Sequence, residues 1–99
     1  MARVELESEV FDDFERFLDH MARFETTDAP ARFGEIIQAI QILIHSPLIG
    51  RPVKGGKREL VIGRASHGYI ALYRFVASID TVFILAIRSQ RESDYKREH

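Results

Sequence analysis

The side chains that could do chemistry in this chain are mostly cations and tyrosines, and they gather in its second half. Residues 1–50 carry 4 Lys and Arg against 10 Asp and Glu, whereas residues 51–99 carry 10 against 5. The first half is therefore acidic, and the second half can bind an acidic partner or nucleic-acid phosphates, or pair with the first. The side chains that we single out as candidates for binding are Lys54, Lys57, Arg64, His67, Tyr69, Arg88, Arg91 and Tyr95.

The sequence does not favour a metal or a cofactor. It has 4 histidines without ligand spacing and no cysteine, and no Ser–His–Asp arrangement can be argued from it. The irregular, Gly-rich segment 47–57 departs from a nucleotide-binding P-loop, because Gly56 stands where that loop needs Lys and a strand follows instead of a helix. We therefore predict no metal site and no cofactor. His67, within a Ser–His–Gly turn, is better explained as an exposed turn residue.

Three short segments of the second half are typical of strands, at residues 58–63, 68–75 and 81–88. They are rich in β-branched and aromatic residues and are separated by turn residues. In the last two, apolar residues fall on both alternating sets, so both faces of this strand pair need a cover. A further strand is predicted near the N-terminus, where Val4 and Leu6 alternate with charged residues.

Two helices are predicted at about 9–25 and 29–46. Ser8 is suited to cap the first, whose acidic residues fall opposite its apolar stripe, and Asp28 with Pro30 opens the second. A helical hairpin of this kind can cover one face of a small sheet but not two. The apolar stripes are Val10, Phe14, Phe17, Leu18, Met21 and Phe24 in the first helix, and Phe33, Ile36, Ile37, Ile40, Leu43 and Ile44 in the second.

These elements predict where the cations meet. Arg88 ends the last strand, so in an antiparallel pair it lies near the start of the preceding strand. The C-terminal segment that follows is too charged to be core, and we expect either a frayed tail or one helical turn across the sheet edge. The residues that we expect on one rim are Lys54, Arg64, His67, Tyr69, Arg88, Arg91 and Tyr95.

Length and composition indicate an ordinary globular protein. Its 99 residues suit a single domain, 1–99, and 45% hydrophobic with 29% charged residues is usual for one. No apolar run approaches the ~20 residues of a membrane span, and MARVELESE does not resemble a signal peptide. We therefore predict a cytoplasmic protein without a membrane partner.

The ordered motifs GRP, REL, GYxxLYR, VxxLAIR and QRE between Gly50 and Tyr95 resemble those of the RelE/ParE superfamily of bacterial plasmid-stabilisation toxins. The resemblance implies an α+β fold of order β-α-α-β-β-β, with a helical hairpin packed on one face of a mostly antiparallel four-stranded sheet. It also implies a cognate antitoxin that binds the toxin directly, giving a toxin–antitoxin hetero-oligomer. An amphipathic helix or an added strand from that antitoxin would cover a second apolar sheet face.

The superfamily contains DNA gyrase poisons similar to ParE and ribosome-dependent mRNA endonucleases similar to RelE. RelE-like enzymes have an arginine directly after the Gly-Tyr of the central strand, where this chain has Ile70, and Ser89 replaces a histidine that is frequent in related sequences. The resemblance therefore favours gyrase inhibition without catalysis, with mRNA cleavage as the alternative and a degenerate toxin as a third reading. The candidates for a nuclease site are Arg74, Arg88, Arg91 and Tyr95.

Overall fold

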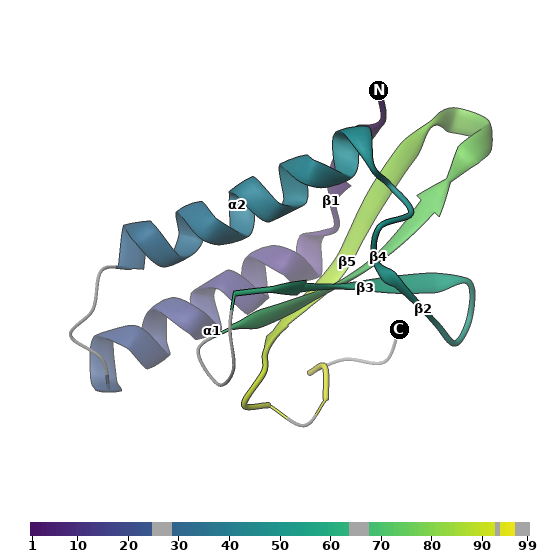
Figure 1. Cartoon of the computed structure of the whole chain (residues 1–99). Coiled ribbons are helices and arrows are strands. Elements are labelled where there is room, and N and C mark those ends of the chain that lie inside the picture. The colour runs from purple at the N-terminus through teal and green to yellow at the C-terminus, as the bar shows by residue number, and fades with distance from the viewer. Residues whose placement is uncertain (25–28, 64–67, 93, 97–99) are drawn as a thin grey trace.

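Figure 1 shows the chain, from a computed structural model, as two neighbouring helices on one side of a twisted sheet. The structure describes residues 1–24, 29–63, 68–92 and 94–96. No helix in these ranges is long and apolar enough to cross a membrane. The elements are β1 (Arg3–Leu6), α1 (Ser8–Phe24), α2 (Ala29–His45), β2 (Arg51–Val53), β3 (Lys57–Ile62), β4 (Tyr69–Val76) and β5 (Thr81–Ser89).

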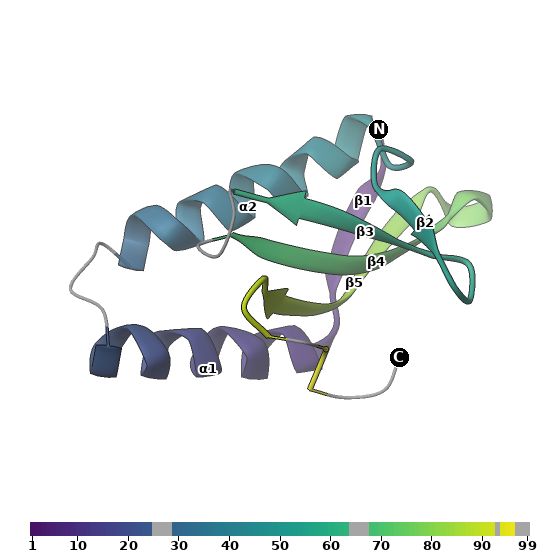
Figure 2. The same cartoon turned by 60° about the horizontal axis from the view of Figure 1, so that its bottom comes forward.

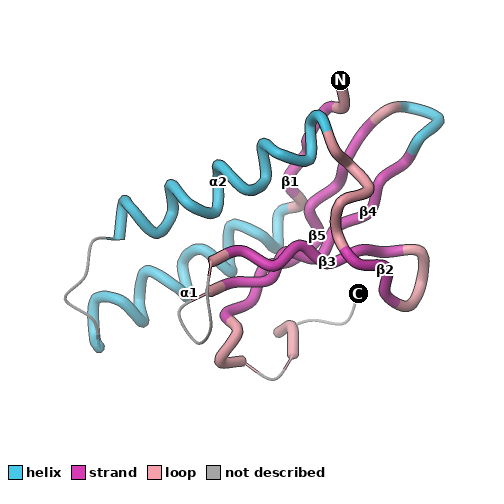
Figure 3. Tube along the Cα trace, viewed as in Figure 1, coloured by secondary structure: helices cyan, strands magenta, loops and turns pink. Residues whose placement is uncertain are grey.

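The described strands form a five-stranded mixed sheet in the order β1-β5-β4-β3-β2, so our prediction of four strands was one short. β1 runs parallel to β5, and the other neighbours are antiparallel. The additional strand, β2, lies inside the segment that we predicted to be irregular. Gly55 and Gly56 adopt positive φ angles of 84° and 72°, which makes the tight turn from β2 to β3. A short 3-10 turn, Ala77–Ile79, joins β4 to β5 (Figure 3).

Both helices match the predicted segments closely. α1 already includes Ser8, which we predicted to precede it as a cap, and residue 25, the expected end, lies outside the described residues, as does Asp28. α2 ends at His45, one residue before the predicted end. The helices contact each other through Phe14 and Phe33, whose ring centroids lie 5.3 Å apart in an edge-to-face arrangement.

The hydrophobic core lies between the helices and one face of the sheet. It contains Val10, Phe17 and Met21 from α1, with Ile36, Ile40 and Leu43 from α2. Leu18 and Ile37, which we assigned to the apolar stripes, are exposed instead, at 47% and 42%. The sheet side of the core consists of Ile62, Tyr69, Ala71, Tyr73, Val82, Ile84 and Ile87.

A β-bulge in β5 decides which of its side chains enter this core. Leu72 is paired with Ala86, but the next residue, Tyr73, is paired with Ile84, so Leu85 is an extra residue in the ladder. The alternation therefore changes phase at Leu85. Strict alternation along the apolar run predicts that Ile87 and Ile84 point to opposite faces of the sheet. This prediction was wrong, since both side chains are buried in the core.

The other face of the sheet, which we call the distal face, turns away from the helices. Residues paired across neighbouring strands point to the same face, and side chains alternate along each strand. In Figure 2 the strands lie between α2 above and α1 below, and the chain beyond β5 continues below the strands. The distal face thus carries Glu59, Ile70, Leu72, Arg74, Ala86 and Arg88.

Candidate functional site

The distal face is covered in part by the C-terminal segment, which we predicted to be a frayed tail or a helical turn at the sheet edge. The hydroxyl of Tyr95 donates a hydrogen bond of 2.7 Å to Glu59 of β3. The guanidinium of Arg88 lies 5.3 Å from the centre of the Tyr95 ring, in cation–π contact. Ile70 and Leu72 are only 6% and 4% exposed on this face, so it is not the bare apolar surface that the sequence suggested.

Glu59 is the acidic centre of this site. Its Oε1 accepts hydrogen bonds from Nε and Nη2 of Arg51 at 3.1 and 2.7 Å. Its Oε2 accepts the hydrogen bond from the Tyr95 hydroxyl. Burial alone would raise the pKa of Glu59, but the hydrogen bonds from Tyr95 and Arg51 outweigh it and hold the pKa below its usual range. Burial and the bond to Glu59 raise the pKa of Tyr95 well above its usual range. Tyr95 therefore stays protonated and acts as a donor.

Arg88 is the cation at one end of the distal face, where it is paired with Ile70. Its Nη1 donates to the backbone oxygen of Glu92 at 2.6 Å, which holds the C-terminal segment against the strand end. Its Nε is buried, and no hydrogen-bond partner for it exists among the described residues. A guanidinium beside a cation–π partner is suited to bind an oxyanion that approaches this face.

A second group of cations lies at the far end of the distal face, near the turn between β2 and β3. Arg74 is exposed, and its Nη1 lies 3.9 Å from the position that a Cβ on Gly56 would occupy. Lys54 lies in this turn, and Lys57 begins β3 directly after it. Arg74 stands four residues beyond Ile70 in β4, so this group is separated from Arg88 by the apolar middle of the face.

The structure does not bring all the rim candidates together. Consecutive residues of a strand point to opposite faces, so Arg88 faces the distal side while Ser89 faces α1. Tyr69 is a core residue on the helix side, and it lines a pocket with Arg91. The expected rim is therefore divided into two sites, one around Arg88 and Tyr95 and one around Arg91 and Tyr69. Arg64 and His67 lie outside the described residues.

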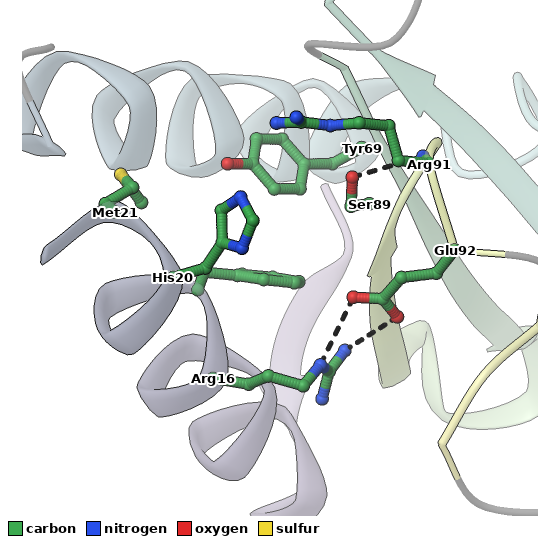
Figure 4. Close-up of a pocket in the computed structure, with 8 residues that line it drawn as sticks. Arg16, His20, Met21, Tyr69, Ser89, Arg91 and Glu92 are labelled. Carbon is green, nitrogen blue, oxygen red and sulfur yellow. Dashed lines mark hydrogen bonds and ion pairs between the residues drawn. The ribbon is translucent and has the colours of Figure 1, made fainter. Parts of the chain in front are cut away.

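The pocket between α1 and the end of β5 has a volume of about 240 Å³. Figure 4 shows Arg91 on one side of the Tyr69 ring and His20 on the other, with Arg16 and Glu92 at the lower edge. Its lining residues are Arg16, Phe17, His20, Met21, Tyr69, Ser89, Arg91 and Glu92.

An ionic network that we did not predict fixes the pocket edge. Asp13, which we placed among the exposed acids of its helix, is 1% exposed. Its carboxylate accepts from the backbone N–H of Ile87 at 2.9 Å and from Nη1 of Arg16 at 2.8 Å. Arg16 also donates to both carboxylate oxygens of Glu92, at 3.2 and 3.1 Å. No local sequence pattern signals the burial of Asp13, because its backbone partner, Ile87, lies in a distant strand.

Metal coordination has no support in the part of the chain that the structure describes, since it contains no group of three or more His, Cys, Asp or Glu residues placed to hold an ion. The two sites instead offer guanidinium groups, phenols and single carboxylates. These groups can bind anions and, on the distal face, donate protons.

The family model described as ParE toxin of type II toxin-antitoxin system, parDE, matches residues 4–94. No curated protein matches the sequence.

The fold is similar to a chain of the chromosomal ParDE system from P. aeruginosa, at 19% identity and a TM-score of 0.71, covering 90% of this chain and 96% of that one. It is also similar to a chain of the RelBE2 complex from Mycobacterium tuberculosis, at 19% identity and a TM-score of 0.65, covering 90% of this chain and 98% of that one. A chain of the intact E. coli RelBE complex is similar as well, at 12% identity and a TM-score of 0.64, covering 93% of this chain and 100% of that one.

Proposed function

The chain belongs to the ParE toxin family of type II toxin–antitoxin systems, and from this premise we propose that it arrests growth by binding DNA gyrase. In this proposal it stabilises an intermediate of gyrase with DNA, breaks no bond itself, and acts in the cytoplasm. A plasmid-stabilisation role follows if the module is carried on a plasmid.

The observation that carries this proposal is the position of Ile70. It lies on the distal face beside its strand partner, Arg88 of β5, at one end of that face, and it is 6% exposed. RelE-like endonucleases have an arginine directly after the same Gly-Tyr motif, and an isoleucine can neither bind a phosphate nor transfer a proton. The position of Ile70 thus lacks the charge that phosphodiester cleavage needs there, while the cations at the two ends of the face are suited to bind without catalysis.

We propose that a cognate antitoxin neutralises the toxin, as the names of the similar complexes suggest. β2 pairs with β3 only from Lys57 to Glu59, so within the described sheet the edge from Leu60 to Ile62 has no neighbouring strand. A groove of about 620 Å³ runs along this edge beside α2, with Ile42 and Val61 exposed at 50% and 52%. An antitoxin segment that adds a strand there would cover both side chains in the hetero-oligomer.

Ribosome-dependent mRNA cleavage is the second candidate, and the cluster of Arg88, Tyr95 and Glu59 favours it. A guanidinium can stabilise a crowded phosphate, and a phenol held in place can supply a proton. The raised pKa keeps Tyr95 protonated, however, so it cannot accept a proton, which leaves Glu59 as the base candidate in this cluster.

Induction of the chain without antitoxin distinguishes the two candidates. Cells are probed in parallel for gyrase-linked DNA breaks with damage signalling and for ribosome-associated mRNA cuts. We expect DNA breaks that disappear in a strain with a toxin-resistant gyrase, and no early mRNA cuts. Site-specific mRNA cuts that Tyr95→Phe or Arg88→Ala abolishes would overturn gyrase inhibition and establish the alternative.

A further inference from the structure

The turn between β2 and β3 is a small cluster of positive charge. The two strands are paired up to Lys57, so residues 54–56 form the turn itself. Nζ of Lys57 lies 3.7 Å from the position that a Cβ on Gly55 would occupy. Arg74 of β4 approaches Gly56 in the same way. We use the name hairpin tip for Lys54, Gly55, Gly56, Lys57 and Arg74.

The charges of the hairpin tip are not neutralised within the part of the chain that the structure describes. The side chains of Lys54, Lys57 and Arg74 form no ion pair or hydrogen bond there. The nearest acid along β3 is Glu59, but both of its carboxylate oxygens already accept hydrogen bonds from other groups. The three cations are therefore available to an anion from outside.

Lys57 and Arg74 are neighbours on adjacent strands. Arg58 is paired with Tyr73, so the residue before the one and the residue after the other come next along the two antiparallel strands, on the distal face. Like charges in such positions repel each other and destabilise the sheet. An anion bound at the hairpin tip removes this repulsion, so the fold itself favours binding.

The hairpin tip fits a phosphate backbone better than an acidic protein segment. Protein interfaces depend on apolar anchors, whereas none of the large apolar side chains exposed in the described chain belongs to residues 51–59. Binding to nucleic-acid phosphates can come from charge alone. In Figures 1 and 2 the turn projects at the margin of the molecule. A two-stranded β-ribbon of this kind is narrow enough for the major groove of B-DNA.

We propose that the hairpin tip binds the phosphate backbone of duplex DNA, whatever its base sequence, while the toxin acts on gyrase. This inference rests on the proposed gyrase function. It assigns the DNA to the end of the distal face around Arg74 and leaves the end around Arg88 for the gyrase protein.

The test is the affinity of the purified full chain for a fluorescent duplex of about 20 base pairs, measured by anisotropy at several salt concentrations. Each neutralised phosphate contributes about 0.9 to the slope of log affinity against log salt, so three contacts predict a slope of about −2.7. Lys57→Gln and Arg74→Gln should each reduce the slope by about 0.9 and weaken binding roughly tenfold near 0.1 M salt. Arg74→Lys, which keeps the charge, should keep the slope. Two unrelated duplex sequences should bind equally.

Arg23→Gln is the matched control. It removes one exposed positive charge at the end of α1, which lies opposite the hairpin tip in Figures 1 and 2, and it should leave the slope unchanged. An equal loss of slope in this control would overturn the proposal, because net charge alone would then explain the binding. Tighter binding of single-stranded RNA or of polyglutamate than of the duplex would overturn it as well, by making RNA or an acidic protein the partner.

Gyrase-dependent DNA cleavage in the presence of the purified chain is measured in parallel. If the unaltered chain increases cleavage while Lys57→Gln and Arg74→Gln bind DNA as tightly as it does, the inference fails and gyrase inhibition stands. If both variants lose DNA binding but the unaltered chain has no effect on gyrase, the DNA site stands and gyrase inhibition fails.

Discussion

The hydroxyl of Tyr95 donates to Glu59 across 2.7 Å, and this single bond joins the C-terminal segment to a strand 36 residues earlier in the chain. Arg88 lies over the same ring, so the phenol connects the cation of β5 with the carboxylate of β3. The distal face is thereby covered in part by a segment that is held through polar contacts and one ring. Such a cover can be loosened by single substitutions without damage to the core.

Tyr95→Phe tests this attachment. Loss of a hydrogen bond to an ionised carboxylate should reduce the free energy of unfolding by about 1 kcal/mol, since Tyr95 is partly exposed. Tyr69→Phe is the matched control, because it removes the same atom from a hydroxyl without a partner in the described chain and should change stability by less than about 0.5 kcal/mol. Urea unfolding measures both. Equal effects of the two variants would contradict the structure.

Glu59→Gln should show a pH-dependent loss of stability. The folded-state pKa of Glu59 is lowered, so on acidification the unfolded chain takes up the proton first, near pH ~4.3. The stabilisation from ionised Glu59 is therefore complete above about pH 5 and is lost as the pH falls through the lower, folded-state pKa. The difference in unfolding free energy between Glu59→Gln and the unaltered chain should be largest near pH 7 and shrink toward pH ~3. A difference that does not change with pH would rule this out.

Asp13→Ala should be among the most destabilising changes at a polar residue. It leaves the buried N–H of Ile87 without an acceptor and Arg16 without one of its two carboxylates. Breaking such a pair costs about 3 kcal/mol or more. Asp12→Ala, at the exposed neighbour, should cost less than about 0.5 kcal/mol. If thermal melts give similar values for both, the network is not formed in solution.

The single domain proposed for residues 1–99 is tested through the two helices. Phe17→Ala and Ile40→Ala remove side chains that are 4% and 5% exposed, and each should cost about 2–5 kcal/mol. Leu18→Ala and Ile37→Ala are the exposed counterparts on the same helices and should cost less than about 1 kcal/mol. One cooperative unfolding transition with this contrast is expected. Two separate transitions would show that the chain is not one domain.

The helices and the long strands could be predicted because their periodicity is local. The order of the elements could be predicted from the same pattern, and the ordered motifs indicated the family. The short strand β2 could not be predicted, because its 3 residues are held by pairing with β3, including the ion pair of Arg51 with Glu59. The bulge at Leu85 could not be predicted either, since an alternating apolar run looks the same on both sides of the extra residue.

Long-range contacts decided the rest of the site. Asp13 is buried because its acceptor oxygen reaches Ile87, 74 residues later, and no local pattern reports that pairing. The GRP and LYR motifs, in contrast, explain each other once the fold is known. A Cβ on Gly50 would lie 2.7 Å from the hydroxyl of Tyr73, and the N–H of Gly50 donates to that hydroxyl at 2.9 Å. A glycine is thus required where the tyrosine packs.

The division of the rim into two sites gives the most direct test of the proposed target surface. If the distal face binds gyrase with DNA, Arg88→Ala should weaken growth arrest in a graded way, by roughly tenfold in the inducer needed, because one contact between charged groups is lost. Arg91→Ala alters the pocket beside α1, so toxicity should stay within about twofold of the unaltered chain. Arg74→Ala, at the other end of the distal face, should act like Arg88→Ala, and the two together should weaken arrest further.

Each variant is first compared by circular dichroism and by its amount in the cell, so that a loss of folded protein is not read as a loss of binding. Full toxicity in Arg88→Ala combined with Arg74→Ala would exclude the distal face as the target surface, and a strong loss in Arg91→Ala alone would move that surface to the pocket.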